Sequence, residues 1–159
     1  MKKISILLMS VLFALAVSCS NKSTGPGNND GNSTQNGIPL SQRAGTYSGT
    51  MNFGALEIVL SDQAQVTSIK LNGTESLEGT TITITEGAGY TGTTIAPFDA
   101  TIYMTNPQNQ SKIPMDAKVK IEFTSADDAS QGATAYVQVP AGTDFNQDSA
   151  TKVPLKYTK

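Results

Sequence analysis

The sequence predicts an all-β domain of about eight short antiparallel strands. Two features of the chain from Gly45 onward carry this prediction. Apolar residues recur there with a period of two, which places them on one face of a strand, and turn-forming residues cluster between these runs. In the same part of the sequence, no stretch of about ten residues has the apolar spacing of an amphipathic helix.

Each strand is justified by its own alternation. Leu56, Ile58 and Leu60 point one way, for example, while Glu57 points the other. The predicted strands cover residues 46–53, 56–60, 65–71, 81–85, 100–105, 118–124, 133–139 and 153–158. The large side chains expected to point inward are Ile58, Ile82, Ile84, Ile121, Phe123, Val137 and Leu155, and they are bulky enough to fill a small barrel.

The connections between the strands leave two architectures open. Most connections are short, which favours consecutive hairpins and therefore a small meander barrel. Three longer connections, near residues 86–99, 106–117 and 140–152, would instead allow the crossovers of a β-sandwich.

The first residues have the pattern of an export signal. A short basic start, Met1-Lys2-Lys3, precedes an apolar run from Ile4 to Val17. The run is about 14 residues long, whereas a transmembrane helix needs roughly 20. We therefore expect a cleaved signal rather than a membrane-spanning segment.

The sequence that follows, Leu15-Ala16-Val17-Ser18-Cys19-Ser20, resembles a bacterial lipobox. In that family the cysteine becomes the first mature residue and its thiol receives a diacylglycerol. The resemblance implies a signal peptide over residues 1–18, a covalent lipid on Cys19 and anchoring in the bacterial cell envelope. The serine after Cys19 implies the outer membrane. The family prefers leucine where this chain has Ala16, and the alternative is an ordinary signal peptide beside an incidental Cys19.

Residues 19–44 are predicted to be a flexible, disordered linker between the anchor and the domain over residues 45–159. They are rich in Ser, Asn, Gly, Thr and Gln and contain almost no large apolar side chain, so they bury too little surface to offset the entropy of ordering. A Gly-rich coil of about 25 residues has an r.m.s. span of roughly 25–30 Å.

The start of the predicted domain, Gly45-Thr46-Tyr47, is similar to the first strand of lipocalin-like domains in bacterial lipoproteins, which begin with Gly-x-Trp or Gly-x-Tyr. This resemblance implies a lipocalin-like barrel, and with it a carrier of a small apolar ligand. The chain has no tryptophan, the residue that lipocalins usually place here.

Composition argues against most catalytic chemistry. The chain has no histidine, and an acylated Cys19 leaves no thiol, so the commonest general base and the usual zinc ligands are missing. The remaining carboxylates, such as Glu75, Glu78 and the adjacent Asp127 and Asp128, lie in turn-rich segments. The net charge of -2 and the lack of a Lys/Arg cluster argue against nucleic acid. We therefore expect no enzyme and no cofactor beyond the covalent lipid.

One spacing suggests a metal. Asp144, Asn146 and Asp148 begin like a calcium-binding loop, which supplies alternate oxygen ligands. Ser149 and Leu155 stand where that loop needs glycine and glutamate. A polar hairpin loop without metal is the favoured interpretation, and weak calcium binding is the alternative.

Aromatic residues outside the predicted core are candidates for a contact face, although a domain with so few aromatic residues usually places them in its core. Tyr90, Phe98 and Phe145 lie in predicted loops, and Tyr136 falls on the outer side of its strand. The sequence therefore predicts an envelope lipoprotein, anchored to the membrane through Cys19, with a non-enzymatic β domain that binds an unidentified protein or other envelope component. A lipocalin-like carrier is the alternative.

Overall fold

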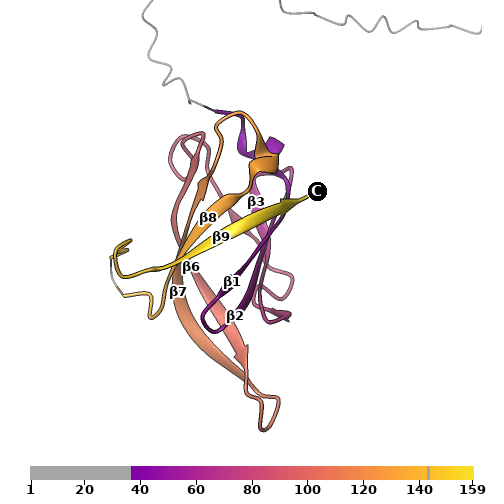
Figure 1. Cartoon of the computed structure of the whole chain (residues 1–159), viewed down its shortest axis with the longest axis vertical. Coiled ribbons are helices and arrows are strands. Elements are labelled where there is room, and N and C mark those ends of the chain that lie inside the picture. The colour runs from indigo at the N-terminus through magenta and orange to yellow at the C-terminus, as the bar shows by residue number, and fades with distance from the viewer. Residues whose placement is uncertain (1–36, 143) are drawn as a thin grey trace, which may run out of the picture. The chain divides into compact units, whose positions relative to one another are not determined.

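The computed structural model describes residues 37–142 and 144–159, which form an all-β fold wound into a nearly closed barrel (Figure 1). The predicted signal peptide, Cys19 and the linker up to residue 36 lie outside the described residues. The strands are β1 (Gly45–Met51), β2 (Gly54–Leu60), β3 (Gln65–Leu71), β4 (Thr74–Glu75), β5 (Ile82–Thr83), β6 (Thr94–Thr105), β7 (Lys112–Phe123), β8 (Ala133–Gln138) and β9 (Thr151–Thr158). Two short 3₁₀ helices, η1 (Leu40–Arg43) and η2 (Ala129–Gln131), complete the fold.

Strand order confirms the meander barrel. The sheet runs β4-β3-β2-β1-β9-β8-β7-β6, and every paired strand is antiparallel to its neighbour. β1–β3 and β6–β9 are therefore two meanders, joined where β9 pairs with β1. The long connections after β6 and β8 link strands that pair directly, so they are hairpin loops rather than the crossovers of a sandwich.

β6 and β7 are longer than the sequence predicts. Each has 12 residues, and the segments 94–99 and 112–117, predicted as loops, belong to them. A register shift between Ile95 and Phe98 breaks the alternation in β6. In β7 the residues from Lys112 to Pro114 are exposed, because the hairpin projects beyond the rest of the barrel (Figure 1). A strand that is exposed to solvent on both faces has no alternation of apolar and polar residues, so its sequence does not predict a strand.

The barrel interior is filled by apolar side chains. Of the predicted inward residues, Ile58, Ile84, Ile121, Phe123, Val137 and Leu155 are buried, and Ile82 is partly buried against the same core. Tyr47, the aromatic residue of the Gly-x-Tyr sequence, is also buried and packs its ring at 5.7 Å from that of Phe123. The alternation therefore predicted the core face correctly.

The barrel closes between β3 and β6 through side chains rather than through a backbone ladder. The segment from Thr74 to Thr83 lies along β3 and pairs with it at both ends, through β4 and β5. On its other side, the Ser76 hydroxyl accepts a hydrogen bond from the backbone N–H of Tyr103 in β6. Leu77, which is 8% exposed, adds its side chain to the core. We call residues 74–83 the seam segment.

The contact between β1 and β9 is a second weak point in the wall. Their pairing covers only Thr46 to Ser48 on β1. It stops before Pro154, because proline has no N–H to donate to a neighbouring strand. Gly49 lies beside Pro154, and a Cβ atom on Gly49 would come within 2.2 Å of the Pro154 carbonyl oxygen. Only glycine fits this close approach.

The folded part begins before the predicted boundary at Gly45. Leu40 and Arg43, both assigned to the linker by composition, are fully buried in η1. The sequence over residues 37–44 has no apolar periodicity, and its order comes from contacts with distant loops. The end of the predicted linker is therefore corrected: residues 37–44 belong to the folded domain.

Candidate functional site

The two ends of the barrel differ in structure. At one end, which we call the capped end, η1 and η2 lie together with the loop over residues 84–93. The opposite end carries the turns at residues 52–53 and 72–73 and the loops over residues 106–111 and 139–150. We call these four connections the distal rim. The chain enters the described fold at the capped end, where the Ile38 N–H donates to the Ala126 carbonyl at 2.9 Å.

Exposed apolar side chains belong to the distal rim and its flanking strand ends. In the part of the chain that the structure describes, the large exposed hydrophobic residues are Phe53 (38%), Ile113 (42%) and Val139 (38%). Phe53 lies in the turn between β1 and β2, Ile113 lies next to the loop between β6 and β7, and Val139 follows β8. Single exposed apolar residues are ordinary, but these three all belong to the same end of the barrel.

The rim also carries many amides. In the loop between β6 and β7, Asn106 accepts from the Gln108 N–H at 2.9 Å, and Asn109 accepts from the Ser111 N–H at 3.0 Å. These side chains use one oxygen to hold the turn, as Asn commonly does. Lys112 and Glu78 form an exposed ion pair beside this loop. The rim therefore offers amide and apolar groups, together with the exposed carboxylates Asp144 and Asp148 of the loop over residues 139–150.

The Gln138 side chain makes three hydrogen bonds to the loop over residues 139–150, and Lys120 Nζ donates a further one to Gln147 at 2.7 Å. Gln138 Nε2 donates to the carbonyls of Ala141 at 2.7 Å and Asp144 at 3.1 Å, and its Oε1 accepts from the Asn146 N–H at 2.6 Å. The Gln138 amide therefore helps to hold the loop that contains the calcium candidates.

The three calcium candidates, Asp144, Asn146 and Asp148, follow one another along this loop. The Asn146 side-chain oxygen accepts from the Asp148 N–H at 3.0 Å, which is a turn rather than a ligand arrangement. Across residues 37–142 and 144–159, no group of three acidic side chains is placed to hold a metal ion. A polar loop without metal therefore stays the favoured interpretation, and weak calcium binding stays the alternative.

The aromatic residues predicted as a contact face do not form one. Tyr90 is fully buried, and Phe98 and Phe145 are half-buried. Tyr136 does lie on the outer side of β8, but it is only 9% exposed. Its hydroxyl donates to Glu122 at 3.0 Å.

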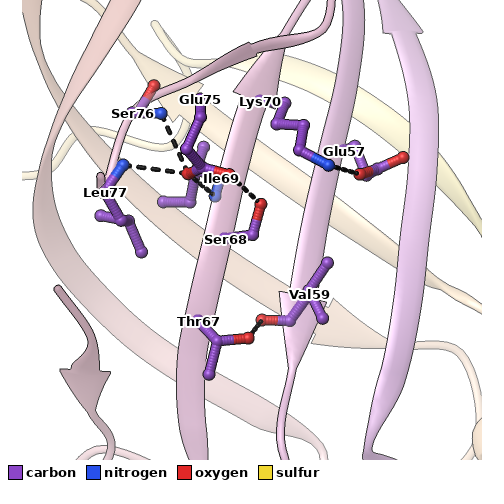
Figure 2. A network of polar contacts seen from close by, with 9 residues as sticks. All are labelled: Glu57, Val59, Thr67, Ser68, Ile69, Lys70, Glu75, Ser76 and Leu77. Atoms are coloured by element: carbon purple, nitrogen blue, oxygen red, sulfur yellow. Dashed lines mark hydrogen bonds and ion pairs between the residues drawn. The ribbon is translucent and has the colours of Figure 1, made fainter. Parts of the chain in front are cut away.

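The carboxylates singled out in the sequence hold turns and strand edges. Glu75 accepts at Oε1 from the backbone amides of Ile69 (3.3 Å), Ser76 (3.0 Å) and Leu77 (3.0 Å), and at Oε2 from the Ser68 hydroxyl (2.5 Å) (Figure 2). Burial acts to raise the pKa of Glu75, but these hydrogen bonds outweigh it and lower the pKa. Asp128 accepts from the Ser130 N–H and caps η2.

Two shallow depressions lie on the outer wall. One, of about 400 Å³, covers the weak contact between β1 and β9 and is lined by Ser48, Gly49, Thr50, Ala55, Pro154 and Lys156. The other, of about 300 Å³, lies on β6 and β7 and is lined by Asp99, Ala100, Thr101, Asp116, Ala117 and Ala141. Both are open and lined by short side chains, so neither resembles the apolar interior that a carrier needs.

Arg43 is the buried polar residue that the sequence analysis missed. Its side chain is fully buried at the capped end, and its Nη1 has no hydrogen-bond partner there. The signal that would have found it is compositional: Arg43 is the only arginine in the chain, and the other ten basic residues are lysines.

Comparison with protein-family models, curated protein sequences and solved structures gives no match for this chain. Within the stretch that the structure covers, no helix is both long and apolar enough to cross a bilayer. The barrel is compatible with a binding module, and any finer statement of function rests on the residues themselves.

Proposed function

We propose that this chain is a lipid-anchored protein of the bacterial envelope, and that its barrel is a non-enzymatic module that binds a macromolecular partner through the distal rim. The observation that carries the binding role is the location of the exposed apolar residues Phe53, Ile113 and Val139 at one end of the barrel. Exposed apolar groups framed by polar side chains are typical of contact surfaces.

The anchoring part of the proposal rests on residues 1–19. The basic start, the apolar run and Cys19 support export followed by lipidation. One acyl chain binds a membrane only marginally, so the two or three chains of a bacterial lipoprotein are what would make the attachment stable. The outer membrane is the proposed location because serine follows Cys19.

The entry point of the chain supports the choice of the rim. The segment between Cys19 and Gly37 joins the barrel at the capped end, beside Ala126. The distal rim lies at the opposite end of the strands, so the point where the described chain begins does not cover it.

The packed interior favours a module that binds a partner on its surface over a carrier that holds a ligand inside the barrel. Bulky side chains such as Ile58, Ile121 and Phe123 fill the space that a carrier would leave for its ligand, commonly about 300 Å³ or more. We therefore prefer the binding module to the lipocalin-like carrier.

The anchor and the rim are tested separately. For the anchor, mass spectrometry of the native protein should find a diacylglycerol-modified Cys19, and a Cys19→Ser variant should move from the membrane to the soluble fraction. An unmodified thiol on a membrane-bound protein would contradict the anchor.

For the rim, cross-linking in intact cells should join the wild-type chain to a specific envelope component. A Phe53→Ser, Ile113→Ser double variant that folds normally should lose that product. A Lys156→Ala variant, altered on the outer wall, should keep it. Equal cross-linking by all three chains would contradict a role for the rim.

A further inference from the structure

The capped end contains a charged group in an unusual environment. The guanidinium of Arg43 is fully buried, and no acidic side chain among residues 37–142 and 144–159 forms an ion pair with it. Burying an unpaired charge is costly unless other groups replace its hydration. The surroundings of Arg43 therefore have to supply that replacement.

Backbone oxygens and aromatic side chains do so at Nη2, Nε and the face of the guanidinium, while Nη1 has no hydrogen-bond partner within the described part of the chain. The two N–H bonds of Arg43 Nη2 are shared among three carbonyls, those of Gly92 at 2.7 Å, Ala126 at 2.9 Å and Ser125 at 3.0 Å. Nε donates to the Tyr90 hydroxyl at 2.5 Å. The guanidinium carbon lies 4.2 Å from the centre of the Phe123 ring, which attracts a cation through its negative face.

This environment suits a guanidinium better than an ammonium. A planar guanidinium can donate in its own plane to several fixed acceptors while its face rests on a ring, whereas an ammonium is a compact and strongly hydrated point charge. The composition agrees: the chain uses lysine at every other basic position and arginine only here.

The same contacts hold the N-terminal segment across the capped end. The Ile38 carbonyl lies 2.7 Å from the Tyr90 hydroxyl, and the Leu40 N–H donates to Glu86 at 2.7 Å. The Arg43 carbonyl accepts from the Tyr47 hydroxyl at 3.0 Å. Residues 38–43 thus connect two loops that are far away in the sequence, at residues 86–92 and 125–126.

We propose that the capped end is a guanidinium-binding site whose occupant is the chain's own Arg43, and that this site latches residues 38–43 to the barrel. The ligand class is a guanidinium ion, recognised by three carbonyls, a phenol and a phenyl face. The latch itself involves only residues of the barrel domain. A further role of the latch, to give the linker a fixed point of attachment on the domain, rests on the proposed function.

The experiment uses the full chain with Arg43→Ala and Arg43→Lys, and Lys156→Ala as an exposed control. We expect Arg43→Ala to lower the Tm by about 10–20 °C, Arg43→Lys to lower it nearly as much, and Lys156→Ala to change it little. Hydrogen exchange at the amides of Ile38 and Leu40 should accelerate in both Arg43 variants, because the segment is released.

Chemical rescue separates a guanidinium site from a merely buried side chain. Ethylguanidinium at low millimolar concentration should raise the Tm of Arg43→Ala by several degrees through binding to the folded state, and ethylammonium should not. If Arg43→Ala does not fold, the Tm and the hydrogen exchange of Arg43→Lys test the proposal instead. An Arg43→Lys chain with wild-type Tm and wild-type exchange at Ile38 would overturn the proposal, as would an Arg43→Ala chain that responds equally to the two cations. Neither outcome depends on the lipid at Cys19.

Discussion

Replacing Glu75 by glutamine should weaken the closure of the barrel between β3 and β6. Glu75 gathers two β3 groups, the Ser68 hydroxyl and the Ile69 amide, and two amides of the seam segment, those of Ser76 and Leu77 (Figure 2). Glutamine keeps the shape and one acceptor oxygen but removes the charge. The perturbation therefore removes the charge from the three amide hydrogen bonds at Oε1 and replaces the acceptor for the Ser68 hydroxyl by an NH2 donor.

The magnitude follows from the kind of hydrogen bond. A hydrogen bond to a charged group contributes about 1.5–3 kcal/mol and a neutral one about 0.5–1.5 kcal/mol. Glu75 is partly exposed, so water screens part of the difference. We expect Glu75→Gln to lower the free energy of unfolding by about 1–2 kcal/mol at pH 7, which corresponds to a Tm lower by roughly 3–8 °C.

The direction of the Glu75 pKa shift determines how this stabilisation changes with pH. The folded-state pKa of Glu75 lies below its ordinary value, so the ionised carboxylate stabilises the fold fully above the unfolded pKa of about 4.3. That stabilisation is lost as the pH falls through the folded pKa. The difference between wild type and Glu75→Gln should therefore be largest near neutral pH and should shrink as the pH falls below the unfolded pKa and through the folded pKa.

Urea unfolding at pH 7 and at pH 3 measures this difference, and the neighbouring strands offer a matched control. Glu57 pairs with Lys70 at 2.8 Å on the exposed face of β2 and β3 (Figure 2). Water screens an exposed pair of this kind, so Glu57→Gln should cost little stability. The reasoning is refuted if both variants lose the same stability, or if the Glu75→Gln difference is equal at the two pH values.

Two further predictions concern the seam and the calcium candidates. Leu77→Ala should cost about 2–4 kcal/mol by leaving a cavity at the seam, and should increase binding of a hydrophobic dye; unchanged urea unfolding would show that Leu77 does not close the wall. Calorimetry with millimolar calcium should give no binding heat, because the Asn146 side-chain oxygen already accepts from the Asp148 N–H. Heat that disappears in an Asp144→Asn, Asp148→Asn double variant would instead establish the site.

The alternating pattern predicted those strands that bury one face and expose the other. In β2 the burial of Leu56, Ile58 and Leu60 follows the sequence pattern, because this stretch packs one side against the core and leaves the other in water. The alternating pattern did not predict strands that lack a buried face. The outer half of the β6–β7 hairpin has no core beneath it, and Lys112, Ile113 and Pro114 are all exposed there.

The capped end could not be predicted from local pattern at all. Arg43 is buried because carbonyls from residues 92, 125 and 126 converge on it, and nothing near position 43 in the sequence encodes those distant groups. Tyr136 was expected on an exposed face, and its ring is buried although it does point outward; Lys120 approaches that ring at 5.6 Å. The exposed apolar residues of the distal rim likewise come to the same end of the barrel only through the strand order.

The pairing of β1 with β9 has a practical consequence for anyone who modifies this protein. Thr158, one residue before the final Lys159, lies opposite Thr46, so both ends of the described chain emerge on the side of η1 (Figure 1). A fluorophore or purification tag fused behind Lys159 would sit beside the incoming linker and leave the apolar tips at the other extremity unobstructed. A label inserted between Asn106 and Ser111 would instead report on whatever approaches those tips.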